Sequence, residues 1–156
     1  MSRRKRKYNR IMKLDEKYLN YNVEKLINII MISGKKNISR KIVYSALSLI
    51  REKYRTNPID IFEKAVLNAT PEIEIKNKKI GGTIYKIPVS ISKRRGEFMA
   101  LSWFKKFSRL RKERNFSISL FKEIVDTYNG SSNSIYKKKE LYKLADLNRA
   151  FAHFAF

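Results

Sequence analysis

The chain has 156 residues and carries 36 lysines and arginines against 14 aspartates and glutamates, a formal net charge of +22 at pH 7. It contains no cysteine and one histidine, which excludes disulfide scaffolds, zinc ribbons, thiol nucleophiles, iron–sulfur sites and multi-histidine metal centres. With 43% hydrophobic residues a core can form. A compact chain with this charge repels itself, so we expect a polyanionic partner to neutralise it.

The first 14 residues contain seven cations and no acid. Like-charge blocks of this kind do not fold alone and are typical of nucleic-acid-binding arms, although a solvated tail is the alternative. We therefore expect a basic arm over residues 1–17 and a single domain over residues 18–156. No apolar segment directly follows these cations, as it would in a secretory signal, and the longest apolar run is too short to span a membrane, so no membrane partner is expected.

Apolar residues at helical spacing predict two helices after the arm. The first buries one face over residues 23–31, and Gly34 is expected to end it. The second buries residues 42–50, with Ser39 as a candidate N-cap.

Four further helices are expected, with apolar faces over residues 62–69, 100–107, 120–128 and 141–148. Asn57 and Pro58 form a cap followed by a proline at the first helical position, and Thr70-Pro71 is expected to stop that helix. Helical spacing returns after Gly96.

Between the third and fourth helices the period changes from helical to alternating. Two alternating runs on either side of Gly81-Gly82 predict a β-hairpin at about residues 72–93. Pro88 cannot donate a ladder hydrogen bond, so the ribbon has exposed edges and needs packing at its root or a partner at its tip. The expected fold is mainly α: a six-helix domain with one extended β-hairpin and a basic N-terminal arm.

No catalytic set is recognisable, so we do not expect an enzyme. His153 lies in an Ala/Phe-rich segment, where a packed or solvent-facing role is far commoner than a general base. Gly81-Gly82-Thr83 lacks the spacing and the Lys-Ser/Thr pair of a phosphate loop. The acids are scattered, no nucleophile elbow surrounds any serine, and no cofactor or metal is expected.

Cations are concentrated in three segments: the arm, the flanks of the hairpin, and residues 93–114. Many phosphate contacts from such segments would give tight, salt-sensitive binding to nucleic acid. Trp103, Phe104 and Phe107 lie at helical spacing and are expected mainly in the core. Tyr85, beside the hairpin cations, is the better candidate for stacking on a base.

Three strings resemble the bacterial type of the family of small-subunit ribosomal protein seven. They are LINIIMISGKKNISRKIVYSA at residues 26–46, IGGTIYKIPV at residues 80–89, and LADLNRAFAHF at residues 144–154. Their order and spacing agree with the family over nearly the whole chain. Lys86 stands where the family usually has Gln, and Ser102 replaces an Arg before Trp103.

The resemblance implies a structural constituent of the small ribosomal subunit that binds the three-prime major domain of its rRNA and nucleates assembly of the head. It implies neighbours among small-subunit ribosomal proteins nine and eleven, and proximity to exit-site tRNA and mRNA. No homo-oligomer is expected. The Ser-Arg-Arg opening and the Phe154 ending resemble plastid members of the family. Together with the Lys/Ile/Asn-rich composition, this resemblance implies a plastid or related organelle, with a bacterial cytoplasm as runner-up.

The expected rRNA contacts combine the basic segments with positions matched to the family: Arg3, Arg4, Lys5, Arg6, Lys7, Arg10, Lys35, Lys36, Lys76, Lys78, Lys79, Lys93, Arg94, Arg95, Arg109, Arg111, Lys112 and Arg114. The resemblance assigns the face toward exit-site tRNA and mRNA to the hairpin tip: Ile80, Gly81, Gly82, Thr83, Tyr85 and Lys86.

Three other functions remain open from the residues alone. A free nucleic-acid-binding architectural protein or regulator would share the charge but would need an oligomer seam or a recognition helix. An enzyme acting on RNA would need a clustered acid–base set. A membrane-surface protein would use basic amphipathic helices.

Overall fold

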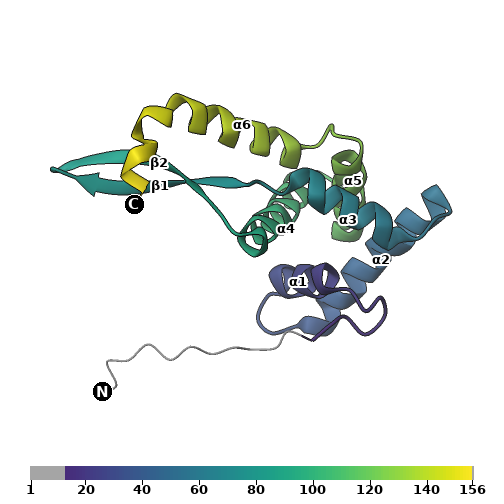
Figure 1. The fold of residues 1–156 in the computed structure, drawn as a ribbon. Helices are drawn as coiled ribbons and strands as arrows, with labels where there is room; N and C mark the ends of the chain where they lie inside the picture. The colour runs from purple at the N-terminus through teal and green to yellow at the C-terminus, as the bar shows by residue number, and fades with distance from the viewer. Residues whose placement is uncertain (1–12, 156) are drawn as a thin grey trace, which may run out of the picture.

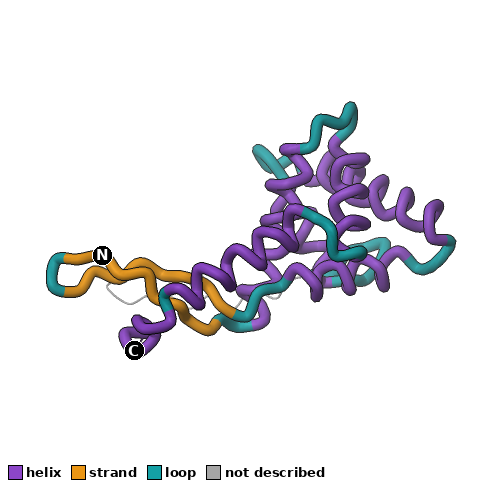
Figure 2. Tube along the Cα trace, turned by 90° about the horizontal axis from the view of Figure 1, so that it is seen from above, coloured by secondary structure: helices purple, strands orange, loops and turns teal. Residues whose placement is uncertain are grey.

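The computed structural model describes residues 13–155, the side chain of residue 155 excepted, so the cations of the expected arm from Arg3 to Arg10 lie outside the described part. Figures 1 and 2 show a group of helices from which a two-stranded hairpin projects. The elements in chain order are α1 (Tyr21–Ile30), α2 (Lys36–Tyr54), α3 (Pro58–Ala69), β1 (Ile73–Ile80), β2 (Thr83–Ser90), α4 (Lys93–Leu110), α5 (Phe116–Tyr128), α6 (Asn133–Leu147) and the 3-10 helix η1 (Arg149–Ala155). This confirms the mainly helical fold with one hairpin.

Helix α1 begins at a side-chain cap, because Asn20 Oδ1 accepts hydrogen bonds from the backbone N–H groups of residues 22 and 23. It ends at Ile30, so the expectation that Gly34 ends it is wrong. Gly34 instead lies in the turn that leads into α2, where its φ of +74° suits a glycine. That turn starts α2 at Lys36, and Ser39, expected as its N-cap, is buried inside the helix.

Helix α3 confirms its predicted ends. Asn57 Oδ1 accepts from the N–H of Ile59 at 3.2 Å, and Pro58 occupies the first helical position. Thr70 is the C-cap, and its hydroxyl donates to the carbonyl of Val66 at 2.7 Å. The chain therefore leaves the helix in an extended conformation and enters β1 within three residues.

The hairpin pairs β1 with β2 in antiparallel register, from Ile73 opposite Ser90 at the root to Ile80 opposite Thr83 at the tip. Gly81 and Gly82 form the two-residue loop, with φ values of +56° and +89°. A type I′ turn needs positive φ at both central residues, which explains the glycine pair.

Helix α4 begins at Lys93, one turn earlier than the return of helical spacing after Gly96 suggests. Gly96 therefore lies inside the first turns of the helix. The position requires glycine because a Cβ there would lie 2.5 Å from the carbonyl oxygen of Pro71. The missing side chain thus lets α4 pack closely against the link between α3 and β1. Because α4 begins at Lys93, its first turn contains the three cations Lys93, Arg94 and Arg95, although the helix dipole disfavours positive charge there.

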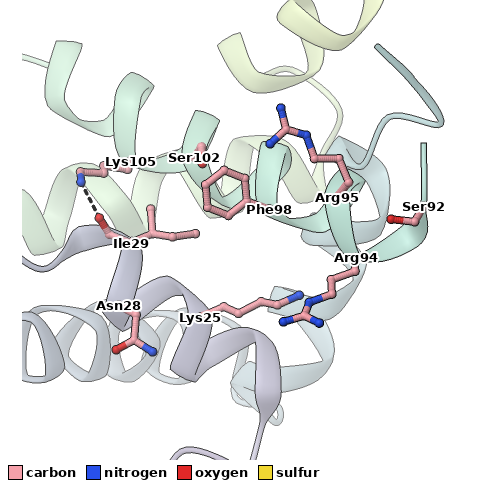
Figure 3. A pocket seen from close by; sticks show the side chains of 9 residues that line it. All are labelled: Lys25, Asn28, Ile29, Ser92, Arg94, Arg95, Phe98, Ser102 and Lys105. Carbon is pink, nitrogen blue, oxygen red and sulfur yellow. Dashed lines mark hydrogen bonds between the residues drawn. The ribbon is translucent and has the colours of Figure 1, made fainter. Parts of the chain in front are cut away.

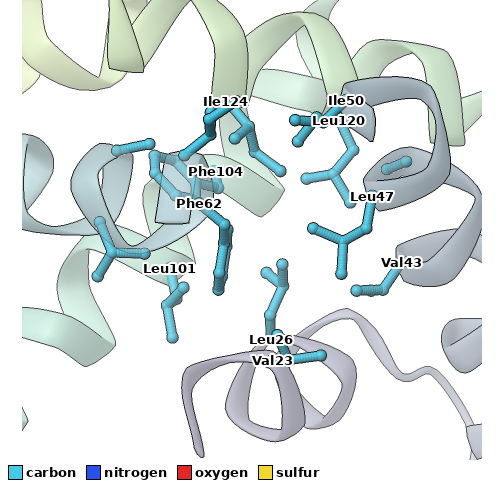
Figure 4. Close-up of a cluster of buried hydrophobic side chains, with 14 of the residues drawn as sticks. Val23, Leu26, Val43, Leu47, Ile50, Phe62, Leu101, Phe104, Leu120 and Ile124 are labelled. Atoms are coloured by element: carbon cyan, nitrogen blue, oxygen red, sulfur yellow. The ribbon is translucent and has the colours of Figure 1, made fainter. Parts of the chain in front are cut away.

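The core lies among α1 to α5, and α5 contacts α2, α3, α4 and α6. Fully buried side chains from all five helices meet there, including Leu26, Leu47, Phe62, Phe104 and Leu120 (Figure 4). Of the aromatic residues expected in the core, Phe104 is buried, while Trp103 and Phe107 are half-buried.

Helix α6 is different, since within it only Ser134 and Ala145 are buried. It runs from the helical group back along the hairpin (Figure 1), contacts β1, and leads into η1, which packs on β2. The hairpin therefore has a second support besides its root.

Candidate nucleic-acid interface

A groove of about 940 Å³ separates the side chains of α1 from those of α4 (Figure 3). Its lining combines four cations, one exposed aromatic ring, one isoleucine and small polar groups: Lys25, Asn28, Ile29, Ser92, Arg94, Arg95, Phe98, Ser102 and Lys105. A positively charged groove with an aromatic platform is the arrangement that binds a nucleic-acid backbone with an unstacked base.

Two of these lysines hold the groove in shape. Lys25 is only 7% exposed, forms an ion pair of 2.7 Å with Glu97, and places its Nζ 4.1 Å from the ring centroid of Tyr21. Lys105 donates to the carbonyl of Ile29 at the end of α1 (Figure 3). Burial lowers the pKa of Lys105, and repulsion from Arg109 lowers it further. Both lysines therefore link α1 to α4.

The open side of the groove presents groups that a ligand can reach. Phe98 is 46% exposed, and the guanidinium carbon of Arg95 lies 5.8 Å from its ring centroid. Arg94 is exposed and has no acidic partner within 4 Å among residues 13–155. An aromatic face beside an unpaired arginine can stack a base and neutralise its phosphate.

A second, smaller groove of about 370 Å³ lies beyond Lys105, where the turn between α1 and α2 meets the end of α4 and the start of α5. It is lined by Ile30, Ile32, Lys35, Ile38, Ser39, Ile42, Arg109 and Phe116. Lys35 and Arg109 come from distant parts of the sequence and meet here at an otherwise apolar site. Arg109 also lowers the pKa of Lys105 electrostatically, so a cation of the second groove lies close enough to act on a cation of the first.

The expected rRNA contacts divide into two groups by their surroundings. Within the described part of the chain, seven have no acidic partner within 4 Å: Lys35, Lys79, Lys93, Arg94, Arg109, Lys112 and Arg114. The others have partners: Lys36 pairs with Glu24, Lys76 and Arg95 pair with Glu74, Arg111 pairs with Glu123 and Asp126, and Lys78 donates to the carbonyl of Phe154.

The hairpin cations do not line either groove, although Lys76 shares the carboxylate of Glu74 with the groove residue Arg95. Tyr85 on β2 is half-buried because its ring packs against Phe151 at 5.1 Å and Phe154 at 6.0 Å between centroids. At the tip, Gly81, Gly82 and Thr83 are exposed, as is Lys86 further along β2, while Ile80 is half-buried. The tip is thus accessible, whereas the ring of Tyr85 is partly covered by η1.

Sequence reasoning missed Phe98, Ser102 and Lys105. A signal was available: together with Arg94 they recur at intervals of four, four and three residues, which is one stripe of a helix. The neighbouring aromatic residues Trp103, Phe104 and Phe107 instead indicate the face of this helix that packs on the core. Lys25 carried no such signal, because its pairing with Glu97 depends on how α1 and α4 cross.

His153 is exposed and its ring centroid lies 3.9 Å from that of Phe154, in keeping with the expected packed or solvent-facing role. Among residues 13–155 no three side chains of the metal-binding types converge on one point. None of the helices in that range combines the length and apolar character needed to cross a bilayer.

Comparison with known proteins adds to this geometry. The sequence profile of the family described as ribosomal protein S7p/S5e matches residues 2–149. The small ribosomal subunit protein uS7 of Mycoplasmopsis synoviae (strain 53) is 41% identical over 154 residues, 99% of each chain. The uS7 protein of Synechococcus sp. (strain JA-3-3Ab) is 39% identical over 156 residues, 100% of each chain. That of Mycoplasmopsis agalactiae is 42% identical over 132 residues, 85% of each chain.

These matches confirm the resemblance seen in the sequence, and they confirm that no catalytic role should be sought. The chain belongs to the ribosomal protein S7p/S5e family, whose members are structural, non-enzymatic components of the ribosome.

Proposed function

We propose that the chain binds the three-prime major domain of small-subunit rRNA directly and nucleates assembly of the subunit head. The observation that carries this proposal is the pair of grooves with cations in their lining, among which Arg94, Arg109 and Lys35 have no acidic partner within 4 Å among residues 13–155. Folded RNA is recognised mostly by its shape, phosphates and 2′-hydroxyls, which suits cations held at fixed separations by a rigid helical core.

The remaining expected contacts extend this interface. In the proposal, the arm over residues 1–17 and the exposed cations after α4 reach further phosphates around the domain of residues 18–156. The hairpin tip, over residues 80–86, faces exit-site tRNA and mRNA. Small-subunit ribosomal proteins nine and eleven are the proposed protein neighbours. Projection of the hairpin from the helices supports a reach of this kind (Figure 1).

Filter binding and footprinting with the purified full chain test the proposal. The three-prime major domain should be bound and protected, and a five-prime-domain fragment of equal length should not. Replacing Arg94, Phe98 and Arg109 with alanine should weaken binding and reduce its salt dependence by about two phosphate equivalents, because two unpaired cations are removed. Equal affinity for both fragments would contradict the proposal.

Cell fractionation separates this role from that of a free architectural protein or regulator, which would not sediment quantitatively with small subunits.

For the compartment we propose a plastid or related organelle, supported by the Ser-Arg-Arg string and the composition. The relatives named above are bacterial, and a bacterial cytoplasm is the alternative. Locating the gene on an organellar or a bacterial genome decides between them.

A further inference from the structure

Glu123 on α5 is an acid with no exposure to solvent. A buried carboxylate is costly unless it is paired and fully hydrogen-bonded. Its Oε2 accepts two hydrogen bonds from Arg111, from Nε at 2.9 Å and from Nη2 at 2.6 Å. The same Nη2 also donates to Asp126 Oδ2 at 2.6 Å. Arg111, the residue that ends α4, is therefore fixed to two acids on α5.

The other oxygen of Glu123 reaches the next helix. Its Oε1 accepts from the backbone N–H of Ser134 at 3.2 Å and from the Ser134 hydroxyl at 2.7 Å. Beside it, the hydroxyls of Thr127 and Ser132 are hydrogen-bonded at 2.8 Å, and the Ser132 oxygen caps α6 by accepting from an N–H of its first turn. Glu123 thus joins the end of α4 to the start of α6. We call Arg111, Glu123, Asp126 and Ser134 the clasp.

Only Ser134 and Ala145 of α6 are buried, and the helix otherwise makes partly exposed contacts with α3, α4 and α5. Further along, α6 supports the hairpin. The hydroxyl of Tyr142 accepts from the N–H of Glu72, directly before β1, at 3.1 Å. Lys138 separately ties α6 to α3 by donating to the carbonyl of Asn68 at 2.9 Å. Beyond α6, η1 packs on β2 around Tyr85. A tilt of α6 at the clasp would therefore be transmitted to the hairpin.

We propose that Arg111 is a positioning residue: through Glu123 it sets the direction of α6, and through α6 it sets the direction in which the hairpin projects. This inference rests on the proposed function in one respect: the proposed function assigns the face toward tRNA and mRNA to the hairpin.

The geometry separates Arg111 from the neighbouring cations. Its side chain is 20% exposed, and its Nε and Nη2 are both hydrogen-bonded to acids of α5. Burial opposes its charge, but hydrogen bonds to Asp126 and Glu123 outweigh this and raise the pKa of the guanidinium. A phosphate reaching it would meet the charge of Asp126. Arg109, two residues earlier, is exposed and has no acidic partner among residues 13–155, which makes it the matched control.

The test measures the hairpin's position in the free full chain. Because the chain has no native cysteine, spin labels can be placed at Thr83→Cys on the tip and Glu52→Cys at the end of α2. Pulsed electron spin resonance then gives the distribution of distances between them. We expect one dominant peak with native Arg111 and its loss in Arg111→Met and in Glu123→Gln. Arg109→Met should keep the peak, and Arg111→Lys should restore it in part.

Glu123→Gln is the sharpest variant because it raises the net charge. If Arg111 were a phosphate contact, this variant would keep the distance peak and bind rRNA at least as well as the native chain. That result would overturn the proposal, as would a distance peak preserved in all variants below their unfolding temperatures. If Glu123→Gln does not fold, Asp126→Asn and Arg111→Lys carry the same comparison. A native chain that fails to bind rRNA would refute the proposed function but leave this distance measurement valid.

Discussion

At the scale of single residues, two positions carry constraints that their type alone does not reveal. Gly96 sits where α4 touches the backbone of Pro71, and Tyr44 donates from its hydroxyl to the buried Asp15 at 2.6 Å. Asp15 also accepts from the N–H groups of Lys17 and Tyr18, so the chain is anchored to α2 from this point onward. Both constraints predict measurable effects on stability.

Gly96→Ala should destabilise the protein. Alanine favours the helix by up to about 1 kcal/mol, but its Cβ would lie 2.5 Å from the carbonyl oxygen of Pro71, and overpacking costs about 1–3 kcal/mol. We expect a net loss in the free energy of unfolding, measured by urea denaturation. Ser45→Ala, at an exposed position of α2, is the control and should change little. A more stable Gly96→Ala protein would show that the link between α3 and β1, which contains Pro71, can shift away from α4 at little cost.

Tyr44 predicts a pH dependence. Burial and the hydrogen bond to Asp15 raise the pKa of this phenol from 10.0 to about 12. The folded state therefore holds the proton more tightly, so this stabilisation is complete below pH 10 and is lost as the pH rises toward 12. Urea denaturation at pH 8 and pH 11 should show a larger alkaline loss for the native chain than for Tyr44→Phe. Equal losses would argue against the bond.

At the scale of elements, the sequence predicts each helix from its apolar spacing but not all of its ends. The cap at Asn57 and the stop at Thr70 are local chemistry, and they were predicted correctly. The starts of α2 and α4 were not. Gly34 forms the turn into α2 rather than the end of α1, and Gly96 serves a close contact with Pro71, which is distant in the sequence. The same limit applies to the grooves: the charges of Lys35 and Arg109 are visible in the sequence, but their meeting is not.

The contact between η1 and the hairpin predicts a second element-scale effect. An isolated pair of strands is marginal in water, and each aromatic pair around Tyr85 contributes about 0.5–1.5 kcal/mol. Replacing Phe151 and Phe154 with alanine should speed amide hydrogen exchange in β2 by roughly an order of magnitude. Leu147→Ala, at a position 79% exposed, should not. Unchanged exchange would mean that the root alone holds the ribbon.

At the scale of the whole molecule, acids and cations differ in how they pair. Most of the acidic side chains form ion pairs within the described part of the fold, whereas many of the cations there do not. Nine ion pairs join described residues, and several of them link different elements, as Lys25–Glu97 and Arg111–Glu123 do. The sequence has 36 cations against 14 acids, so the acids are too few to neutralise the positive charge. The free protein should therefore be sensitive to salt and to polyanions.

The arm provides the matching prediction, although its cations lie outside the described residues. Changing Arg3, Arg4, Arg6 and Arg10 together to alanine should weaken rRNA binding and reduce the salt slope by up to about 3. Filter binding across a salt series measures this. The control removes four exposed cations from α2 and α3, namely Lys41, Arg51, Lys53 and Lys64. If both sets flatten the slope equally, the arm makes no specific contribution.

The bond between Lys78 and the carbonyl of Phe154 joins residues 76 positions apart. During synthesis on a translating ribosome, the two strands leave the exit tunnel well before the segment that braces them. The nascent hairpin therefore lacks its contacts with η1 while α4, α5 and α6 are synthesised, and these contacts form only when η1 emerges. Premature termination before residue 149 would leave an unbraced ribbon attached to an otherwise folded helical core.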